Sequence, residues 1–258
     1  MKKQLLASKN SPSGNIEVWQ KNTVRYLYIQ DKTAVQSQVD MAQKEKLQLQ
    51  HNQAMMSFLL FQNKPESVLL FGLGGGSIIH FLTHWFPQLQ ITAVDIDEKV
   101  VEIAKQYFEI PETPQININI ADAENYLAKN KINDINVIIV DLHDGKSLPE
   151  FLYKPDYIAQ CFDALSSRGI LVINMLVNSD QEFLAILTAL RQSFIGTSFC
   201  LQFDNQKNIL LFAFKSPQIP DITQLPEKAA SCQKKYNIEF EQLLKNIVIV
   251  EAKVDVLM

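Results

Sequence analysis

Four of the eight glycines in this 258-residue chain fall within five consecutive positions: Gly72, Gly74, Gly75 and Gly76. Average usage would give about 18 glycines in a chain of this length. Glycine permits backbone angles that other residues avoid and lets a ligand approach the main chain closely. A chain that uses glycine sparingly and then clusters it therefore marks a candidate binding loop.

Carboxylates follow the next three apolar segments of strand type. Asp95 lies about twenty residues beyond the glycine loop, where an acid can accept the hydroxyls of a ribose. Asp122 is placed where a carboxylate could accept the exocyclic amine of an adenine. Asp141 begins a segment that also holds His143 and Asp144, so a histidine that could act as a second base lies between two acids.

The glycine spacing favours an adenosyl group over a dinucleotide. The loop has glycines at 72, 74 and 76, whereas the dinucleotide fingerprint GxGxxG needs a glycine where this chain has Ser77. A carboxylate at Asp122 also suits a nucleoside without a pyrophosphate. Together with Asp95, these features predict an adenosyl cofactor.

An alternation of strand and helix patterns places these residues at one edge of a sheet. Continuous apolar runs separated by helical periodicity predict parallel strands with helices on both faces, so the fold class is α/β. The strands are expected at 67–71, 91–94, 116–120, 135–140 and 170–175, with a hairpin of 197–203 and 208–214 after them. The helices are expected at 78–85, 98–108 (with Asp97 as its N-cap), 123–129, 156–165 and 180–192.

The N-terminal part has a different pattern. Alternating apolar and polar residues predict a small antiparallel β unit, with strands at 16–20, 24–30 and 33–39. Helical spacing follows over 47–61, and a mixed helical tail follows the prolines after residue 216. We therefore expect an N-terminal β domain with its linking helix, an adenosyl-cofactor-binding domain and a C-terminal helical extension, spanning 1–62, 63–215 and 216–258.

Composition excludes several classes of protein. The net charge of −4 argues against a nucleic-acid binder, and no apolar run reaches the length of about 18 residues that a membrane span needs. Positive charge is concentrated in the first 60 residues, so the rest of the chain is acidic and suits a cationic ligand. The three cysteines are widely spaced, which favours a reducing cytoplasm over a disulfide framework. His80 and His84 lack a third ligand pattern, so no metal is expected.

The chain resembles the spermidine synthase (polyamine aminopropyltransferase) family in the stretch VLLFGLGGGSIIHFLTHWFPQLQITAVDIDEKVVEIAKQYF, and in IADAENYL and INVIIVDLHDG after it. With AVQSQVD before and RGILVINM after, the resemblance covers about residues 16–215. It implies a Rossmann-like, seven-stranded, methyltransferase-type sheet beside an N-terminal β domain, in a dimer or tetramer. It also implies transfer of an aminopropyl group from decarboxylated S-adenosylmethionine to a small diamine such as putrescine.

The resemblance implies roles by position. Asp95 would hold the ribose, Asp122 with Ala123 the adenine, and Asp141 and Asp144 would be the catalytic acids. A primary amine attacks only when it is unprotonated, so a carboxylate such as Asp141 must orient it and accept its proton. The remaining implied cofactor residues are Gln36 from the β domain and Gly72, Gly74, Gly75 and Gly76 on the sulfonium side.

The departures from the family pattern concern the donor tail and the acceptor amine. Ser77 stands where the family has an aspartate that pairs with the free amine of the cofactor. His51 stands where a tyrosine is expected, and His143 lies where the family has small hydroxyl residues; both are the expected substrate-side residues. Since Ser77 would tolerate the carboxylate of intact S-adenosylmethionine, a methyltransferase remains an alternative. A non-catalytic descendant of the family is a third.

Overall fold

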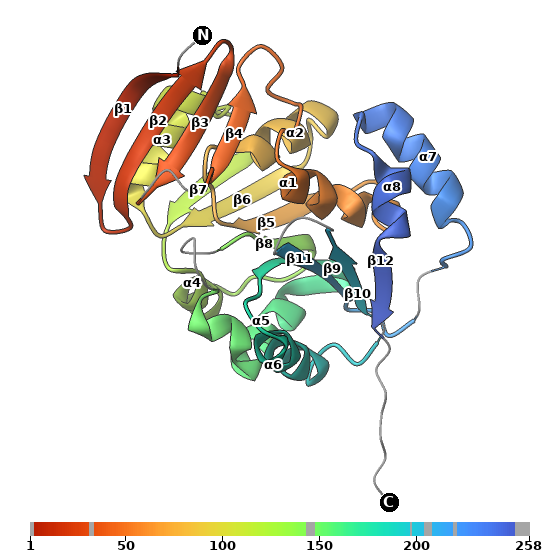
Figure 1. Cartoon of the computed structure of the whole chain (residues 1–258). Coiled ribbons are helices and arrows are strands. Elements are labelled where there is room, and N and C mark those ends of the chain that lie inside the picture. The colour runs from red at the N-terminus through yellow and green to blue at the C-terminus, as the bar shows by residue number, and fades with distance from the viewer. Residues whose placement is uncertain are drawn as a thin grey trace, which may run out of the picture.

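The structure, a computed structural model, describes residues 3–30, 34–142, 148–196, 198–203, 208–218 and 221–250. Its N-terminal part is an antiparallel sheet of order β1-β2-β3-β4 (Figure 1). The strands are β1 (Gln4–Ser11), β2 (Gly14–Lys21), β3 (Val24–Ile29) and β4 (Ser37–Asp40). The predicted small β unit is confirmed.

The larger sheet has eight strands in the order β12-β10-β11-β9-β8-β5-β6-β7. The five strands from β9 to β7 are parallel, and β11, β10 and β12 add to them in antiparallel pairs. The predicted α/β class is confirmed. The strands are β5 (Ser67–Phe71), β6 (Gln90–Asp95), β7 (Ile116–Ile120), β8 (Ile135–Val140), β9 (Leu165–Leu176), β10 (Ser198–Gln202), β11 (Asn208–Phe214) and β12 (Ile247–Val250).

Two edge strands were not predicted. The strand β1 is largely exposed and its sequence does not alternate, so its pairing with β2 gives it its extended form. The strand β12 lies in the segment expected to be helical, pairs with β10 and adds an eighth strand to the expected seven. Both strands take their extended form from pairing with a neighbouring strand, β2 for β1 and β10 for β12. Local periodicity does not reveal such pairing.

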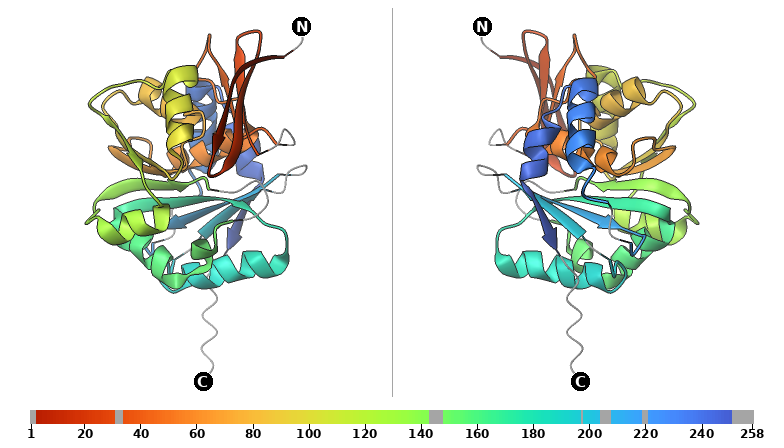
Figure 2. Two further views of the ribbon diagram at one scale, coloured as in Figure 1. Left: turned by 90° about the vertical axis from the view of Figure 1, so that its left-hand side faces the viewer. Right: turned by 90° about the vertical axis from the view of Figure 1, so that its right-hand side faces the viewer.

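Helices cover both faces of the large sheet (Figure 2). Alternation along β5 sends Val68 and Leu70 into one core and Leu69 and Phe71 into the other. The expected helix over 47–61 is a short α-helix followed by a 3₁₀ turn. The helices are α1 (Gln50–Met55), η1 (Met56–Leu60), α2 (Ser77–Trp85), α3 (Glu98–Phe108), α4 (Ala123–Lys129), η2 (Glu150–Tyr153), α5 (Pro155–Ala164), α6 (Asp180–Arg191), α7 (Leu225–Tyr236) and α8 (Phe240–Lys245).

The small sheet packs on α3, on the side of the large sheet opposite α5 and α6 (Figure 2). Ile16 and Val18 of β2 share a buried cluster with Val100 and Ile103 of α3. Lys9 pairs with Glu102 at 3.3 Å, and Lys44 pairs with Glu109. These contacts hold the tips of the small sheet over the carboxyl ends of the parallel strands. None of the helices within the described ranges is both long and apolar enough to cross a bilayer.

Candidate active site

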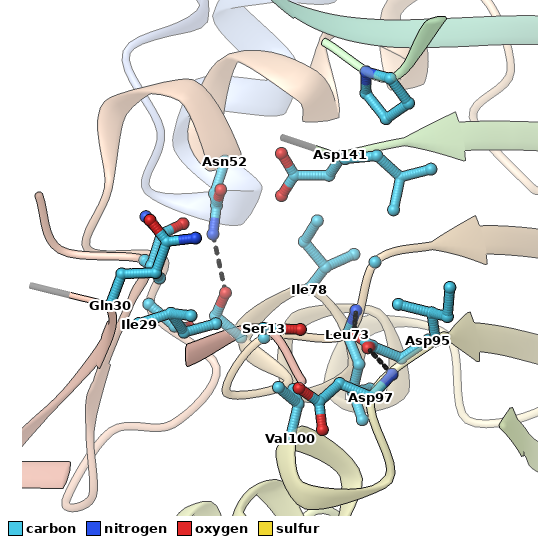
Figure 3. Close-up of a pocket in the computed structure, with 18 residues that line it drawn as sticks. Ser13, Ile29, Gln30, Asn52, Leu73, Ile78, Asp95, Asp97, Val100 and Asp141 are labelled. Atoms are coloured by element: carbon cyan, nitrogen blue, oxygen red, sulfur yellow. Dashed lines mark hydrogen bonds between the residues drawn. The ribbon is translucent and has the colours of Figure 1, made fainter. Parts of the chain in front are cut away.

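A cavity lies where the strand order of the large sheet reverses. The chain continues from β5 to β6 and β7 on one side, and then returns to place β8 on the other side of β5. The chain leaves β5 towards α2 on one face of the sheet and leaves β8 towards α5 on the other face. Ligands of open α/β sheets bind at such a point. The cavity has a volume of about 310 Å³, and residues of the small sheet, α1 and the strand ends line it (Figure 3).

Asp95 ties the glycine loop to the end of β6. Its two carboxylate oxygens accept hydrogen bonds from the backbone N–H groups of Leu73, at 2.9 Å, and Asp97, at 3.0 Å. Burial raises the pKa of Asp95 above its usual value, while these two N–H groups act in the opposite direction. The carboxylate is thus held rigidly on the cavity wall, where its remaining lone pairs can accept the two hydroxyls of a diol.

Gly72 and Gly74 form the part of the glycine loop that lines the cavity. Gly72 has a φ of +93°, and a Cβ atom there would lie 2.2 Å from the carbonyl oxygen of Asp141. The close approach of the loops after β5 and β8 therefore requires glycine at position 72.

Gly75 and Gly76 contact protein, and neither is among the residues that line the cavity. A Cβ atom at Gly75 would lie 2.9 Å from Ser37 Oγ, and one at Gly76 would lie 2.6 Å from the side chain of Ile110. These two glycines let the start of α2 pack against its neighbours. Their predicted contact with a cofactor stays a prediction.

Ser77 pairs with a residue that the sequence did not single out. Asn52 Nδ2 donates to Ser77 Oγ over 2.7 Å, and both side chains are buried on the cavity wall. Asn52 is only 4% exposed, and its Oδ1 atom has no hydrogen-bond partner among the described residues. An acceptor of this kind on a cavity wall is available to a donor of a bound molecule.

The neighbouring prediction, His51, has a different position. It is half-buried and makes contacts with protein, but it is not among the residues that line the cavity. Its predicted role on the substrate side stays a prediction. Gln36, predicted to reach in from the β domain, lines the cavity.

Asp141 is held by a second residue that the sequence analysis missed. Asn174 Nδ2 donates to Asp141 Oδ1 over 2.7 Å, and Asn208 Nδ2 donates to Asn174 Oδ1 over 2.9 Å. Asn174 is 0% exposed. The signal that could have revealed it is an asparagine near the end of an otherwise apolar strand, since a buried amide requires partners.

Asp122 acts as the N-cap of α4. It accepts hydrogen bonds from the backbone N–H of Asn125 at 2.9 Å and from the Asn125 side chain at 3.1 Å. Neither Asp122 nor the buried Ala123 is among the residues that line the cavity, and adenine binding by them stays a prediction. His143 and Asp144 lie outside the described residues.

Asp97 is the N-cap of α3, as predicted, and also lines the cavity. It accepts the backbone N–H of Lys99 at 2.9 Å. Burial opposes its ionisation, but the nearby hydroxyls of Ser13 and Ser11 hold its pKa below the usual value. Asp97 thus joins the first turn of the small sheet to this edge of the large sheet.

The two helical histidines do not form a pair of metal ligands. His80 is buried, with its Nε2 atom 2.8 Å from the carbonyl oxygen of Phe108, and burial lowers its pKa. His84 is exposed and packs edge-on against Trp85. In the described part of the chain, no three side chains are grouped so that they could bind a metal ion.

Known proteins are similar to this chain in sequence and in fold. A spermine/spermidine synthase domain matches residues 48–199. The polyamine aminopropyltransferase of Neisseria meningitidis serogroup A is 30% identical over 235 residues, which cover 90% of this chain and 88% of that protein. A probable spermidine synthase from Corynebacterium glutamicum superposes with a TM-score of 0.75 at 16% identity, covering 90% of this chain and 93% of the other. Human methyltransferase-like protein 13, solved with SAH, superposes with a TM-score of 0.66 at 23% identity, covering 74% and 93%. The chain belongs to the spermine/spermidine synthase family.

Proposed function

We propose that the protein transfers an aminopropyl group from decarboxylated S-adenosylmethionine to a small diamine such as putrescine. The observation that carries the proposal is the placement of Asp95 and Asp141 on one cavity, at the ends of strands that flank β5. A ribose acceptor and a proton acceptor then share a site at the strand-order reversal. The chain's membership of the family supports the same reaction.

The reaction assigns Asp141 the role of proton acceptor. The nitrogen of the acceptor amine forms a bond to the propyl carbon next to the sulfonium, the carbon–sulfur bond breaks, and methylthioadenosine leaves. The attacking nitrogen carries an extra proton after the step, and Asp141 accepts it. Asp144 would assist by binding the other ammonium of the diamine, and His51 and His143 are proposed to lie near that amine.

The donor fits the features of the opposite side of the cavity. Asp95 would accept the ribose hydroxyls, Asp122 with Ala123 would contact the adenine, and the glycine loop would let the sulfonium approach. Gln36 would close this side from the small sheet.

Asn52 and Ser77 are proposed to receive the ammonium at the end of the aminopropyl group. The Oδ1 atom of Asn52 is a buried acceptor without a partner among the described residues, and an ammonium is a charged donor that needs acceptors. Hydrogen bonds from a charged donor to such neutral oxygens are stabilising, although weaker than a pair with a carboxylate. The aspartate usual in the family is thereby replaced by an uncharged pair.

The proposal is tested with purified protein, decarboxylated S-adenosylmethionine and a panel of diamines and polyamines. We expect methylthioadenosine and the aminopropylated amine to form in equal amounts, and calorimetry to show binding of the donor. The absence of both binding and product with every amine would overturn the proposal.

A methyltransferase that uses intact S-adenosylmethionine is the second candidate, because Ser77 leaves room for a carboxylate that an aspartate would repel. Its distinguishing test compares the two donors by calorimetry in the wild type and in Ser77→Asp. A preference for the intact donor in the wild type, reversed in the variant, would favour the methyltransferase. A preference for the decarboxylated donor in both would exclude it.

We further propose a cellular location, an oligomeric state and a domain division for the protein. A cytoplasmic location is supported by the three free cysteines within the described residues, and a homodimer or homotetramer is the usual state in the family. We also propose the domain division 1–62, 63–215 and 216–258, which rests on the sequence pattern and on the resemblance to the family. Light scattering after gel filtration measures the oligomeric state, and a monomer would contradict that part.

A further inference from the structure

Three polar side chains form a hydrogen-bonded row across adjacent strands beside the cavity: Asn208, Asn174 and Asp141. The two bonds in the row measure 2.9 Å and 2.7 Å. Because β11, β9 and β8 are neighbours in the sheet, the row runs across the sheet and joins residues that are far apart in the sequence. We call it the Asn–Asn–Asp row.

Strand register brings the three side chains together. Val140 pairs with Ile173, so Asp141 and Asn174 are the next residues along two parallel strands. Asn174 pairs with Leu210 on β11, and Asn208 lies two residues away on the same face. That diagonal separation is within reach of polar side chains.

The chemistry of the row fixes its direction. An ionised carboxylate only accepts hydrogen bonds, whereas an amide has one donor end and one acceptor end. Asn174 must therefore turn its Nδ2 towards Asp141, and its Oδ1 then needs a donor on the other side. Asn208 supplies that donor. A reversed amide would place two acceptors 2.7 Å apart in a buried place, which is unfavourable.

We propose that Asn174 and Asn208 are positioning residues for Asp141. They hold its Oδ1 atom in place, so that Oδ2 is left to accept a hydrogen from the attacking amine. In the described part of the chain, the bond from Asn174 is the hydrogen bond that the Asp141 carboxylate receives. The inference rests on the proposed function of Asp141.

The sharpest test is Asn208→Asp, because it changes a residue that does not touch Asp141. A carboxylate at 208 competes for the donor end of Asn174, so Asn174 can no longer satisfy both neighbours. We expect kcat for aminopropyl transfer to fall about 10- to 100-fold, while KM for the donor changes less than about threefold. Asn174→Leu removes both bonds at similar volume and should lower kcat to a similar extent.

Two control variants isolate the effect. Asn208→Gln keeps an amide donor and should restore kcat to within about threefold of the wild type. Gln88→Glu adds the same charge at an exposed residue just before the amino end of β6, whereas the cavity lies at the carboxyl ends of the strands. It should leave kcat unchanged. Gln88→Glu controls for the added net charge, and Asn208→Gln controls for the loss of the asparagine itself.

A readout independent of turnover is the side-chain amide NMR signal of Asn174, assigned by its loss in Asn174→Leu. We expect it to move in Asn208→Asp and not in Gln88→Glu. An unmoved signal with wild-type kcat would overturn the proposal, as would equal losses of kcat and donor affinity, which indicate a general structural role. If the wild type transfers no aminopropyl group and the signal still moves as expected, the proposed function fails and the positioning of the carboxylate stands.

Discussion

The two sides of the cavity are built by different means. On one side, Asp95 and Asp97 accept hydrogen bonds from the backbone N–H groups of residues 73, 97 and 99, which lie within the continuous segment from β5 to α3. On the other side, Asn52 binds Ser77 and Asn174 binds Asp141, through side chains 25 and 33 positions apart in the sequence. Figure 3 shows Asp141 and Asn52 in one part of the cavity and Asp95 and Asp97 in another.

Under the proposed function, the backbone-held side would bind the ribose, and the side-chain side would meet the donor's ammonium and the acceptor amine. Backbone donors persist whatever side chains surround them, so the Asp95 side can keep one ligand group over many sequence changes. Side-chain pairs change with every substitution, and the departures from the family pattern at Ser77 and His51 lie towards that side. The following predictions test whether the two sides can be altered independently, beginning with the largest expected effect.

Asp141→Asn should abolish most of the turnover and spare donor binding. The amide keeps the shape of the carboxylate but cannot accept the proton of the attacking amine, so kcat should fall about 10²- to 10⁴-fold. Donor affinity, measured by calorimetry, should stay within about threefold because the Asp95 side is untouched. A kcat within tenfold of the wild type would refute the role of Asp141 as proton acceptor. The side of the cavity that holds Asp141 would then have no special role in turnover.

Gly72→Ala should destabilise the fold at the point where the two sides meet. Its Cβ atom would lie 2.2 Å from a backbone oxygen at a φ of +93°, so the loops after β5 and β8 must separate. We expect the free energy of unfolding in urea to fall by about 3 kcal/mol or more.

The matched control for that variant is Gly74→Ala. Its Cβ atom would meet Ser37 at an ordinary 3.5 Å, although φ is +52°. A loss of about 1–2 kcal/mol is expected there. Equal losses in the two variants would show that close approach at Gly72 is not the cause.

Asn52→Leu should weaken donor binding and change stability little. The change removes a buried acceptor that has no partner in the described structure, which offsets the loss of the hydrogen bond to Ser77, while a bound ammonium loses its acceptor. We expect the dissociation constant of the decarboxylated donor to rise about tenfold in calorimetry. Asn130→Leu, an exposed change away from the cavity, should leave it unchanged. An unaltered donor affinity in Asn52→Leu would remove Asn52 from the site.

His80, a buried residue that is not among those lining the cavity, should give the smallest effect, which is a pH dependence of stability. Burial lowers its pKa below 6.5, so the unfolded chain binds a proton that the folded protein excludes. Stability is therefore full above pH 6.5 and falls as the pH drops below that value, by at most about 1.4 kcal/mol per pH unit for one proton. Urea unfolding between pH 7.5 and 5 should show a shallower decline in His80→Gln. The same slope in both proteins would assign the acid sensitivity to other groups.

Much of the site could be predicted because it is encoded locally. Gly72, Gly74, Ser77, Asp95 and Asp141 line the cavity, as expected from a glycine loop and strand-end acids, and Gln36 lines it as the family resemblance implied. Asp122 shows the limit of this reasoning, since an acid that begins a helix serves as an N-cap whether or not it meets a ligand. Asn52 and Asn174 belong to no motif, and their importance depends on what the fold places opposite them.

The sequence by itself determined the α/β class, the binding loop and the acids at the strand ends, because periodicity, glycine spacing and capping act over a few residues. Tertiary structure decided which of those residues face one cavity. It also brought Asn52 to Ser77, joined Asn208 and Asn174 to Asp141, and added β1 and β12 to the sheet edges. These features depend on strand order and packing between segments distant in the chain, and neither is encoded in the local pattern of any one segment.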